Sequence, residues 1–501
     1  MASSPESSMY IEFDDICVKQ AKIIRRPPEA YKNESKPARG AIFIANYREF
    51  RNLPRRDGSE EDVKYIIELY SQMGYKLVES IQDRTKKQTV EAMKTFGRND
   101  IHNEVDSMVL FVMSHGEYED RFFTSDDEVM TSQEVYEIFN NDCPALKLKP
   151  KFFIFQHCRN GQLHSTALPQ KKVKTLSDTM TIYSTLPGNG SFRHRMYGSP
   201  FIHQMCEVFM NHSWQDELED LINKLNKGIL SQCQHIDYRE IRKAEDFYFN
   251  PESLDNNMEQ KLSEQPKVCY DKAITSQAKQ QMISPENKLV LLINNLDGCV
   301  SDMDKLKYVF HHDLGYRVFG PSQNLTNEAL KDVINDFKKQ SHGESAIIIF
   351  YGDGFNDYIV TSDHSAVHFK ELQRLFNDIN CPSLSKKPKI FLTNLCYFDG
   401  DITYDRTNSD SQDLISPVQD MFFLNVEVEG NNHCENGSLL TEALCRVLKN
   451  DRNTRKPVMK TMRAVSKTLD ELQEGMENYI CELRSIKFPP NFALKPRKHH
   501  S

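Results

Sequence analysis

The feature that most constrains the fold of this chain is an internal repeat whose unit has the size of a whole domain. In each copy, apolar runs of buried-strand length alternate with stretches in which apolar residues recur at helical spacing. Gly315-Tyr316 follows Gly74-Tyr75 by 241 positions, and Lys387-Pro388-Lys389 follows Lys149-Pro150-Lys151 by 238. Alternating helices and continuously apolar strands predict an α/β fold in each copy, with a mostly parallel sheet covered by helices on both faces.

The repeat and the composition between its copies predict the domain organisation. We expect a short leader over residues 1–36 and a first domain over 37–250. A linker rich in Glu, Gln, Asn and Lys should follow over 251–286, flexible because it has few residues that can form a core. The second domain should cover 287–489, and a basic tail 490–501.

Composition excludes several classes of protein. The chain has 63 basic and 72 acidic residues, and this net charge of −9 disfavours nucleic acid or an anionic membrane as a partner. No apolar run approaches the ~20 residues that span a bilayer, and the amino end lacks the pattern of a secretion signal. Twelve cysteines in 501 residues are too dilute for a disulfide scaffold, and no Cys-x-x-Cys pair offers a zinc or redox site. We therefore expect a cytoplasmic protein without metal or cofactor.

In the first copy, two buried strands end in reactive side chains. Met108–Met113 leads to Ser114-His115-Gly116-Glu117, and Phe152–Phe155 leads to Gln156-His157-Cys158-Arg159-Asn160. The carboxyl ends of parallel strands meet at the edge where open α/β sheets place their sites. An imidazole can assist a thiol there, and the thiolate is the competent nucleophile. The pattern predicts a Cys/His site.

The motifs around these two residues resemble those of the caspases. Arg56-x-Gly58-Ser59, Tyr183–Arg193, Gly198–Ile202 and Phe247-Tyr248-Phe249 occur in the order found in that family, and the likeness covers residues 37–250. The resemblance implies a caspase-haemoglobinase-like fold with a six-stranded sheet in each domain. It also implies a cysteine endopeptidase that cuts protein substrates after an exposed aspartate, in apoptosis or related signalling.

The resemblance assigns a role to each matching position. Cys158 would be the nucleophile and His115 the acid/base, and the backbone N–H groups of Gly116 and Cys158 would form the oxyanion hole. Five residues would contact the substrate: Arg56, Gln156 and Arg193 in the pocket for the aspartate, and Ser191 and Phe192 along the peptide groove. Two guanidiniums in one shielded pocket agree with this specificity, because only a carboxylate compensates their charge.

The first copy departs from the family at two positions beside the cysteine. His157 stands where the family has alanine, and Asn160 where it has glycine. Overpacking by an imidazole costs about 1–3 kcal/mol, and we expect it to shift the strand end that aims Cys158. The stretch 161–177 has no aspartate at which the chain could cut itself. Two hypotheses stay open: a working peptidase, and an inactive homologue that regulates other caspases by pairing with them.

The second copy lacks most of these candidate catalytic and substrate-binding residues. The histidine position falls on Tyr351, the two pocket arginines fall on Leu296 and Asn432, and Cys396 remains. A Ser341-His342-Gly343-Glu344 sequence precedes the apolar strand instead of following it, which puts it at the opposite edge of the sheet from Cys396. The second copy is therefore expected to be a degenerate, pseudocaspase domain.

The last strand of each copy indicates how the two domains pair. Caspases pair through this strand, and in the first copy Arg239–Asp246 is too densely charged to favour pairing with itself. Tyr479–Ile486 in the second copy is alternating and more apolar. We expect the two domains to pair within one chain through these strands, with pairing to a separate caspase-like domain as the alternative.

Overall fold

The computed structural model describes most of both repeats. The described residues are 16–20, 30–31, 39–117, 120–140, 143–160, 176–229, 234–243, 245–249, 288–296, 300–340, 342–355, 358–363, 365–397, 405–406, 420–429, 437–450, 456–472, 479–489 and 492–494. The predicted linker 251–286, and most of the predicted leader and tail, lie outside them.

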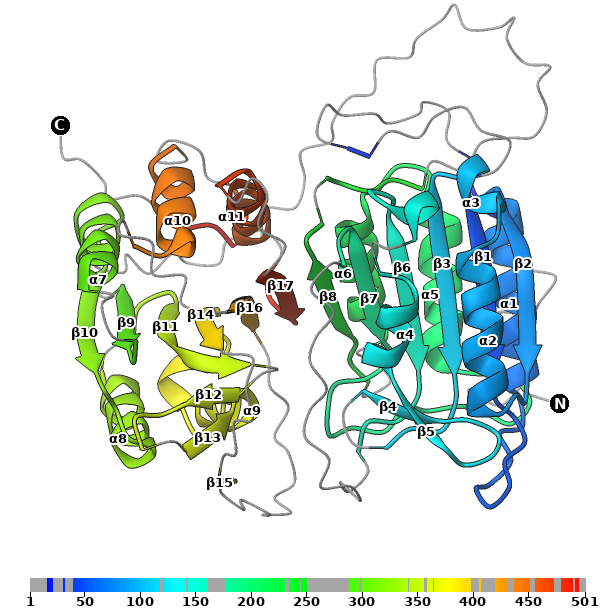
Figure 1. The fold of residues 1–501 in the computed structure, drawn as a ribbon, viewed down its shortest axis with the longest axis horizontal. Coiled ribbons are helices and arrows are strands. Elements are labelled where there is room, and N and C mark those ends of the chain that lie inside the picture. The colour runs from blue at the N-terminus through cyan, green and yellow to red at the C-terminus, as the bar shows by residue number, and fades with distance from the viewer. Residues whose placement is uncertain are drawn as a thin grey trace, which may run out of the picture.

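The described strands of the first repeat form a sheet in which all pairs are parallel except the last (Figure 1). Their order is β2-β1-β3-β6-β7-β8. The strands are β1 (Gly40–Asn46), β2 (Tyr75–Gln82), β3 (Ser107–Met113), β6 (Lys151–Gln156), β7 (Thr179–Tyr183) and β8 (Asp237–Ile241). Every residue of β1, β3, β6 and β7 is buried, which explains their continuous apolar runs.

Alternate side chains along each strand pack under helices on opposite faces of this sheet. Ile42 and Ile44 belong to the core below α1, α5 and α6, whereas Phe43 belongs to the core below α2 and α4. The helices are α1 (Ser59–Gln72), α2 (Lys86–Gly97), α3 (Ile101–Glu104), α4 (Ser132–Ile138), α5 (Pro200–His212) and α6 (Leu218–Ile229), with a 3₁₀ turn at Pro144–Leu146. A separate hairpin of β4 (Arg121–Phe123) and β5 (Val129–Thr131) follows β3.

The second repeat has the same architecture, with the strand order β10-β9-β11-β14-β16-β17 and an antiparallel last strand. The strands are β9 (Leu289–Asn294), β10 (Arg317–Gln323), β11 (Ala346–Phe355), β14 (Lys389–Tyr397), β16 (Met421–Glu429) and β17 (Tyr479–Ile486). The helices are α7 (Val300–Lys307), a π-helical turn (Tyr308–Asp313), α8 (Asn327–Lys338), a 3₁₀ turn (Pro382–Leu384), α9 (Phe369–Leu375), α10 (Leu439–Asn450) and α11 (Val458–Leu472). The prediction of two α/β domains with helix-covered, mostly parallel sheets is confirmed.

One local difference separates the repeats. β11 is long enough to continue into the hairpin strand β12 (Tyr358–Val360), which pairs with β13 (Ser365–His368) and through it with β15 (Asp405–Arg406). In the first repeat the corresponding hairpin, β4–β5, is not part of the main sheet.

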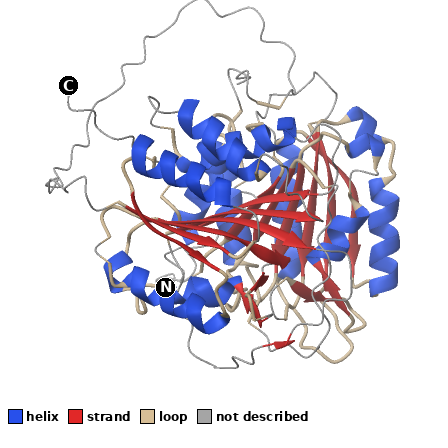
Figure 2. Ribbon diagram, turned by 60° about the vertical axis from the view of Figure 1, so that its left-hand side comes forward, coloured by secondary structure: helices blue, strands red, loops and turns tan. Residues whose placement is uncertain are grey.

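The two repeats share one sheet. β8 and β17 pair antiparallel, with Leu483 opposite Glu240 and Arg484 opposite Arg239, so all described strands except β4 and β5 form one 15-stranded sheet. Figure 2 shows this sheet as a twisted layer with helices on either side. The strands that meet are the two that the sequence singled out.

The charges of the β8 segment meet opposite charges at this junction. Arg484 of β17 donates to Asp237 at 2.8 and 2.9 Å, and Arg463 of α11 donates to Glu240 at 2.9 and 2.5 Å. A strand that would repel its own copy is thus neutralised by the second repeat. Within the described residues, no helix has the length and apolarity that crossing a membrane requires.

Candidate active site

The ends of β3 and β6 bring His115 and Cys158 to the same edge of the first sheet. The ladder between these strands ends with Met113 opposite Gln156, and the N–H of Ser114 donates to the Gln156 carbonyl at 3.1 Å. His115 and Cys158 each come two residues after that last pair, so both lie just beyond the same edge of the sheet. A Cβ added to Gly116 would lie 1.9 Å from the carbonyl oxygen of Cys158, so the two loops approach closely.

His115 is held in one tautomer by a backbone contact. Its Nε2 lies 2.7 Å from the carbonyl oxygen of Pro54, which can only accept, so Nε2 carries the proton and Nδ1 has the free lone pair. Partial burial lowers the pKa of His115 below its usual value, and the charges of Arg56 and Arg193 lower it further. The ring is therefore neutral near pH 7 and can accept a proton. Sequence analysis missed Pro54, because a carbonyl contact leaves no side-chain signal.

The bridge to β4 fixes the direction of the backbone N–H of Gly116. Gly116 faces Phe122 in an isolated antiparallel bridge, between two backbone hydrogen bonds of 3.0 Å made by the neighbouring residues. In this pattern the facing residues direct their own N–H groups away from each other. The N–H of Gly116 therefore points away from β4.

The thiol of Cys158 contacts the segment that was expected to line the groove. The N–H of Ser191 donates to Sγ at 3.3 Å, and Sγ lies 3.6 Å from the Ser191 carbonyl oxygen. The Ser191 hydroxyl is 2.9 Å from that of Ser184 and accepts from Gln156 at 3.3 Å. Phe192 is 55% exposed beside this segment. The structure thus brings Cys158, Ser191 and Gln156 together and leaves the Phe192 ring largely in solvent.

The expected aspartate pocket contains a buried guanidinium with unused hydrogen-bonding capacity. Arg56 is 1% exposed, and it donates from Nη1 to the Tyr47 carbonyl at 2.8 Å and from Nη2 to Gln156 Oε1 at 2.6 Å. Among the described residues its Nε has no acceptor. Burial and the nearby charge of Arg193 lower the pKa of Arg56 to about 9. Arg193 is half-buried and donates from Nε to the Asp57 carbonyl at 2.9 Å. The pocket is short of negative charge.

The carboxylate nearest this pocket, Asp62, has a structural role, and a corresponding aspartate in the second repeat has the same role. Asp62 accepts from the N–H and the hydroxyl of Ser199, both at 2.6 Å, and burial raises its pKa to about 6. In the second repeat, Asp302 accepts from the N–H of Ser438 at 3.0 and 2.9 Å. Because a repeat without the catalytic histidine keeps this contact, it supports the fold, not the chemistry.

His157, which was expected to shift the strand end that aims Cys158, lies in a buried aromatic site. The imidazole is 1% exposed and packs among the rings of Phe122, Phe155 and Tyr183, at centroid distances of 6.0, 6.1 and 6.2 Å. The β3–β6 ladder runs undisturbed to the last residue of β6. His157 Nδ1 lies 2.7 Å from the Cys158 carbonyl oxygen and so donates to it. Burial lowers the pKa of His157 to about 4.

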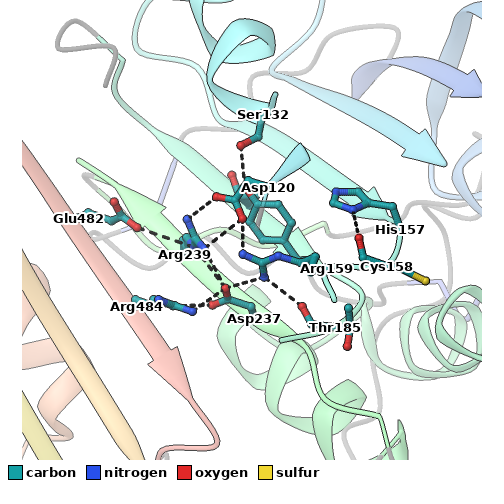
Figure 3. A network of polar contacts seen from close by, with 12 residues as sticks. Asp120, Ser132, His157, Cys158, Arg159, Thr185, Asp237, Arg239, Glu482 and Arg484 are labelled. Atoms are coloured by element: carbon teal, nitrogen blue, oxygen red, sulfur yellow. Dashed lines mark hydrogen bonds and ion pairs between the residues drawn. The ribbon is translucent and has the colours of Figure 1, made fainter. Parts of the chain in front are cut away.

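Sequence analysis gave no role to Arg159, which the structure places at the centre of a buried ionic network (Figure 3). Its guanidinium pairs with Asp120 and Asp237, donates to the Thr185 carbonyl at 3.0 Å, and lies 4.1 Å from the centre of the Tyr183 ring. The two aspartates are 39 and 78 residues away along the chain. No local spacing could have predicted these partners.

In the second repeat, strand register corrects the position expected for the histidine. Asp353 lies opposite Cys396 in the β11–β14 ladder, so the aspartate, and not Tyr351, corresponds to His115. Burial raises the pKa of the Cys396 thiol to about 12, and the charge of Asp353 acts in the same direction. Leu296 is buried, and Asn432 lies outside the described residues. A carboxylate is too weak a base to take the proton from a thiol whose pKa is about 12.

His342 is a structural residue. It precedes β11 and is 6% exposed, and its Nε2 lies 2.9 Å from the Phe337 carbonyl. His102 makes the equivalent contact with Phe96 at 2.8 Å in the first repeat. The expectation that the Ser341–Glu344 sequence lies away from Cys396 agrees with this placement.

The chemistry gathered at the first repeat's edge is a thiol, a neutral imidazole and two guanidiniums. Within the described part of the chain, no three His, Cys, Asp or Glu side chains are grouped as metal ligands. Together with the fold, this edge defines a protein of the caspase-like α/β class. The chain belongs to the caspase family: the model of the caspase domain matches residues 39–247 and again residues 287–488.

Known proteins agree with this assignment. Caspase-12 of Macaca mulatta is 30% identical over 234 residues, covering 41% of this chain and 55% of the relative. A Homo sapiens protein named inactive caspase-12 is 30% identical over 209 residues, covering 36% of this chain and 60% of the relative. This chain thus spans between half and two thirds of these relatives. The crystal structure of the Drosophila initiator caspase Dronc is 23% identical, with a TM-score of 0.40, covering 47% of this chain and 94% of that one.

Proposed function

We propose that the first repeat is a cytoplasmic cysteine endopeptidase that cuts proteins after aspartate, in apoptosis or related signalling. The second repeat is its non-catalytic partner. The boundaries 37–250 and 287–489, with the linker 251–286 between them, define the two working units. Family membership and the β8–β17 junction support this division of labour.

The observation that carries the proposal is the state of Arg56. A guanidinium that is buried, close to a second guanidinium and left with an unused Nε–H among the described residues is costly unless a ligand compensates it. A carboxylate on a short side chain supplies both charge and acceptors. Aspartate before the cut bond fits this requirement, and its uncharged amide does not.

The geometry supports a mechanism in which neutral His115 takes the Cys158 proton at Nδ1 while Pro54 holds Nε2. The thiolate attacks the carbonyl carbon after the aspartate, and the N–H groups of Gly116 and Cys158 receive the developing oxyanion. His115 returns the proton to the leaving amine, and water then releases the acyl group from sulfur.

Peptide turnover by the full chain tests this function. We expect release of a fluorophore from a peptide ending in aspartate at least 1,000-fold faster than from its asparagine isostere, on the order of what a site built for a polar group achieves. Cys158→Ala should abolish turnover. Equal rates on the two peptides would contradict the assignment of the pocket.

One observation favours the second candidate function, a regulator that pairs with other caspases. The main chain of Ser191 contacts the Cys158 thiol from two sides, and an incoming carbonyl must displace it. One relative carries the name inactive caspase-12. An electrophile bearing an aspartyl group separates the two: labelling of Cys158 supports a peptidase, and failure of both labelling and turnover supports the regulator.

A further inference from the structure

We propose that Arg484 of the second repeat is a positioning residue for the cysteine loop of the first repeat, acting through Asp237 and Arg159. This role rests on the proposed peptidase function and specifies how the degenerate repeat supports it. The contact path runs from β17 across the junction to β8, and from β8 to the residue that follows the nucleophile (Figure 3).

The first contact crosses the junction. Arg484 Nε donates to Asp237 Oδ1 at 2.8 Å, and Arg484 Nη2 donates to Oδ2 at 2.9 Å. This two-point contact fixes the plane of the carboxylate. Asp237 has no exposed surface and Arg484 is 8% exposed, so water does not substitute for either partner.

The second contact passes from Asp237 to Arg159. Oδ2 of Asp237 also accepts from Arg159 Nη1 at 2.9 Å and from Arg239 Nη2 at 3.0 Å. Because Arg484 alone of these three arginines contacts Oδ1, its loss leaves the carboxylate held through Oδ2 only and free to rotate, which loosens the geometry of its contact with Arg159. Burial would raise the pKa of Asp237, but the guanidiniums of Arg484, Arg239 and Arg159 outweigh it and keep the group ionised.

Arg484 also balances the charge of the network. The cations Arg159, Arg239 and Arg484 face the anions Asp120, Asp237 and Glu482, the last at 3.9 Å from Arg239. Removing Arg484 takes one positive charge away from Asp237, which has no exposed surface, and a buried carboxylate tolerates that loss poorly.

The third contact joins Arg159 to residues 188 and 189, which precede the segment expected to line the peptide groove. Arg159 follows Cys158 directly, and its N–H donates to the Asn189 carbonyl at 2.9 Å while its carbonyl accepts from Gly188 at 2.8 Å. Asp120, which also pairs with Arg159, comes from the loop that carries His115. Arg159 therefore joins three loops: its backbone contacts residues 188 and 189 beside the groove, and its guanidinium contacts Asp120 in the loop of His115 and the Thr185 carbonyl.

The second repeat offers a matched control at the same junction. Asp470 of α11 pairs with Arg242 at 3.1 Å, just beyond the end of β8, and among the described residues neither member of this pair contacts Arg159 or Asp237. Asp470→Asn removes one ionic contact across the junction, as Arg484→Gln does, without touching the path to Cys158. Arg484→Lys keeps the charge but not the two-point geometry.

The test compares these three variants in the full chain. For Arg484→Gln we expect kcat/KM on an aspartyl peptide to fall about tenfold, Arg484→Lys to be intermediate, and Asp470→Asn to stay within about twofold of wild type. Alkylation of Cys158 by iodoacetamide, followed by mass spectrometry, should slow in the same order. Hydrogen exchange should rise in peptides containing Arg159 and Gly188 for Arg484→Gln only.

These readouts separate the proposal from the peptidase function. A wild-type chain with neither turnover nor labelling by the aspartyl electrophile removes the peptidase function, whereas alkylation and exchange still decide whether Arg484 orders the cysteine loop. Equal effects of Arg484→Gln and Asp470→Asn on both readouts would mean that Arg484 only joins the repeats, and this would overturn the proposal.

Discussion

Replacing Arg463 with methionine should destabilise the junction between the repeats more than replacing an exposed charged residue does. This guanidinium has a side chain only 9% exposed, and it contacts Glu240 at 2.5 Å, Asp246 at 3.2 Å and Glu219 at 3.3 Å. Methionine preserves most of the volume and removes the charge. The carboxylate of Glu240, which has no exposed surface, then loses its closest partner.

The structure sets the size of the loss. Removing one partner of a buried ion pair costs about 3–5 kcal/mol, because the other charge stays buried. Lys243 remains 3.4 Å from Glu240, so we expect the lower end, about 3 kcal/mol. Burial raises the pKa of Glu240, but Arg463 and Lys243 outweigh this and hold it at about 2. Without Arg463 that pKa rises, so the variant's deficit should shrink as the pH is lowered and the carboxyl takes up a proton.

Urea unfolding measures this loss with two probes. Fluorescence of Trp214, the single tryptophan of the chain, reports on the first repeat, and far-ultraviolet circular dichroism reports on both. The control is Arg446→Met, since Arg446 is 47% exposed and 3.7 Å from Glu442, and its loss should cost less than about 0.5 kcal/mol. A loss below about 1 kcal/mol for Arg463→Met would refute the reasoning.

Three further variants test individual contacts. His157 has a pKa of about 4 in the fold and an ordinary value of 6.5, so its protonation destabilises the fold as the pH falls between these values. Between pH 7 and 5 the free energy of unfolding, measured in urea, should fall by about 2 kcal/mol more for wild type than for His157→Ala. Equal losses of stability would contradict the burial argument. In Gly116→Ala the new methyl would lie 1.9 Å from the Cys158 carbonyl oxygen, so we expect kcat on an aspartyl peptide to fall by roughly 100-fold or more. Cys396→Ser should leave both that turnover and the iodoacetamide reactivity of the chain unchanged within about twofold, because the Cys396 thiol has a pKa of about 12.

The fold was predictable because its signals are local. Each signal is a pattern of a few neighbouring residues: a continuous apolar strand, apolar residues at helical spacing, or a Lys-Pro-Lys sequence. Together these patterns predicted the sheet and the helices that cover its two faces. The 238-residue offset between the two Lys-Pro-Lys sequences carries His115 to residue 353, so the position of Asp353 was available in the sequence. The motif Phe350-Tyr351-Gly352-Asp353 suggested Tyr351 instead, and the ladder with β14 places Asp353 opposite Cys396.

The sequence predicted which side chains form the candidate site, but not the hydrogen-bond and ion-pair partners that hold them. Matching motifs pointed to Cys158, His115 and Arg56, which the structure brings to one edge. The partner of His115 is a backbone carbonyl, and the partners of Arg159 come from the loop after β3 and from β8. His157 looked like a steric obstacle because the sequence does not show the aromatic space that holds it.

The shared sheet has a consequence for how this protein responds to dilution. Strands that meet between separate chains come apart as the concentration drops, but β8 and β17 belong to one polypeptide and form their junction in a unimolecular step. Dilution alone therefore does not separate these two strands, and a second caspase-like domain that pairs through β8 must first displace β17.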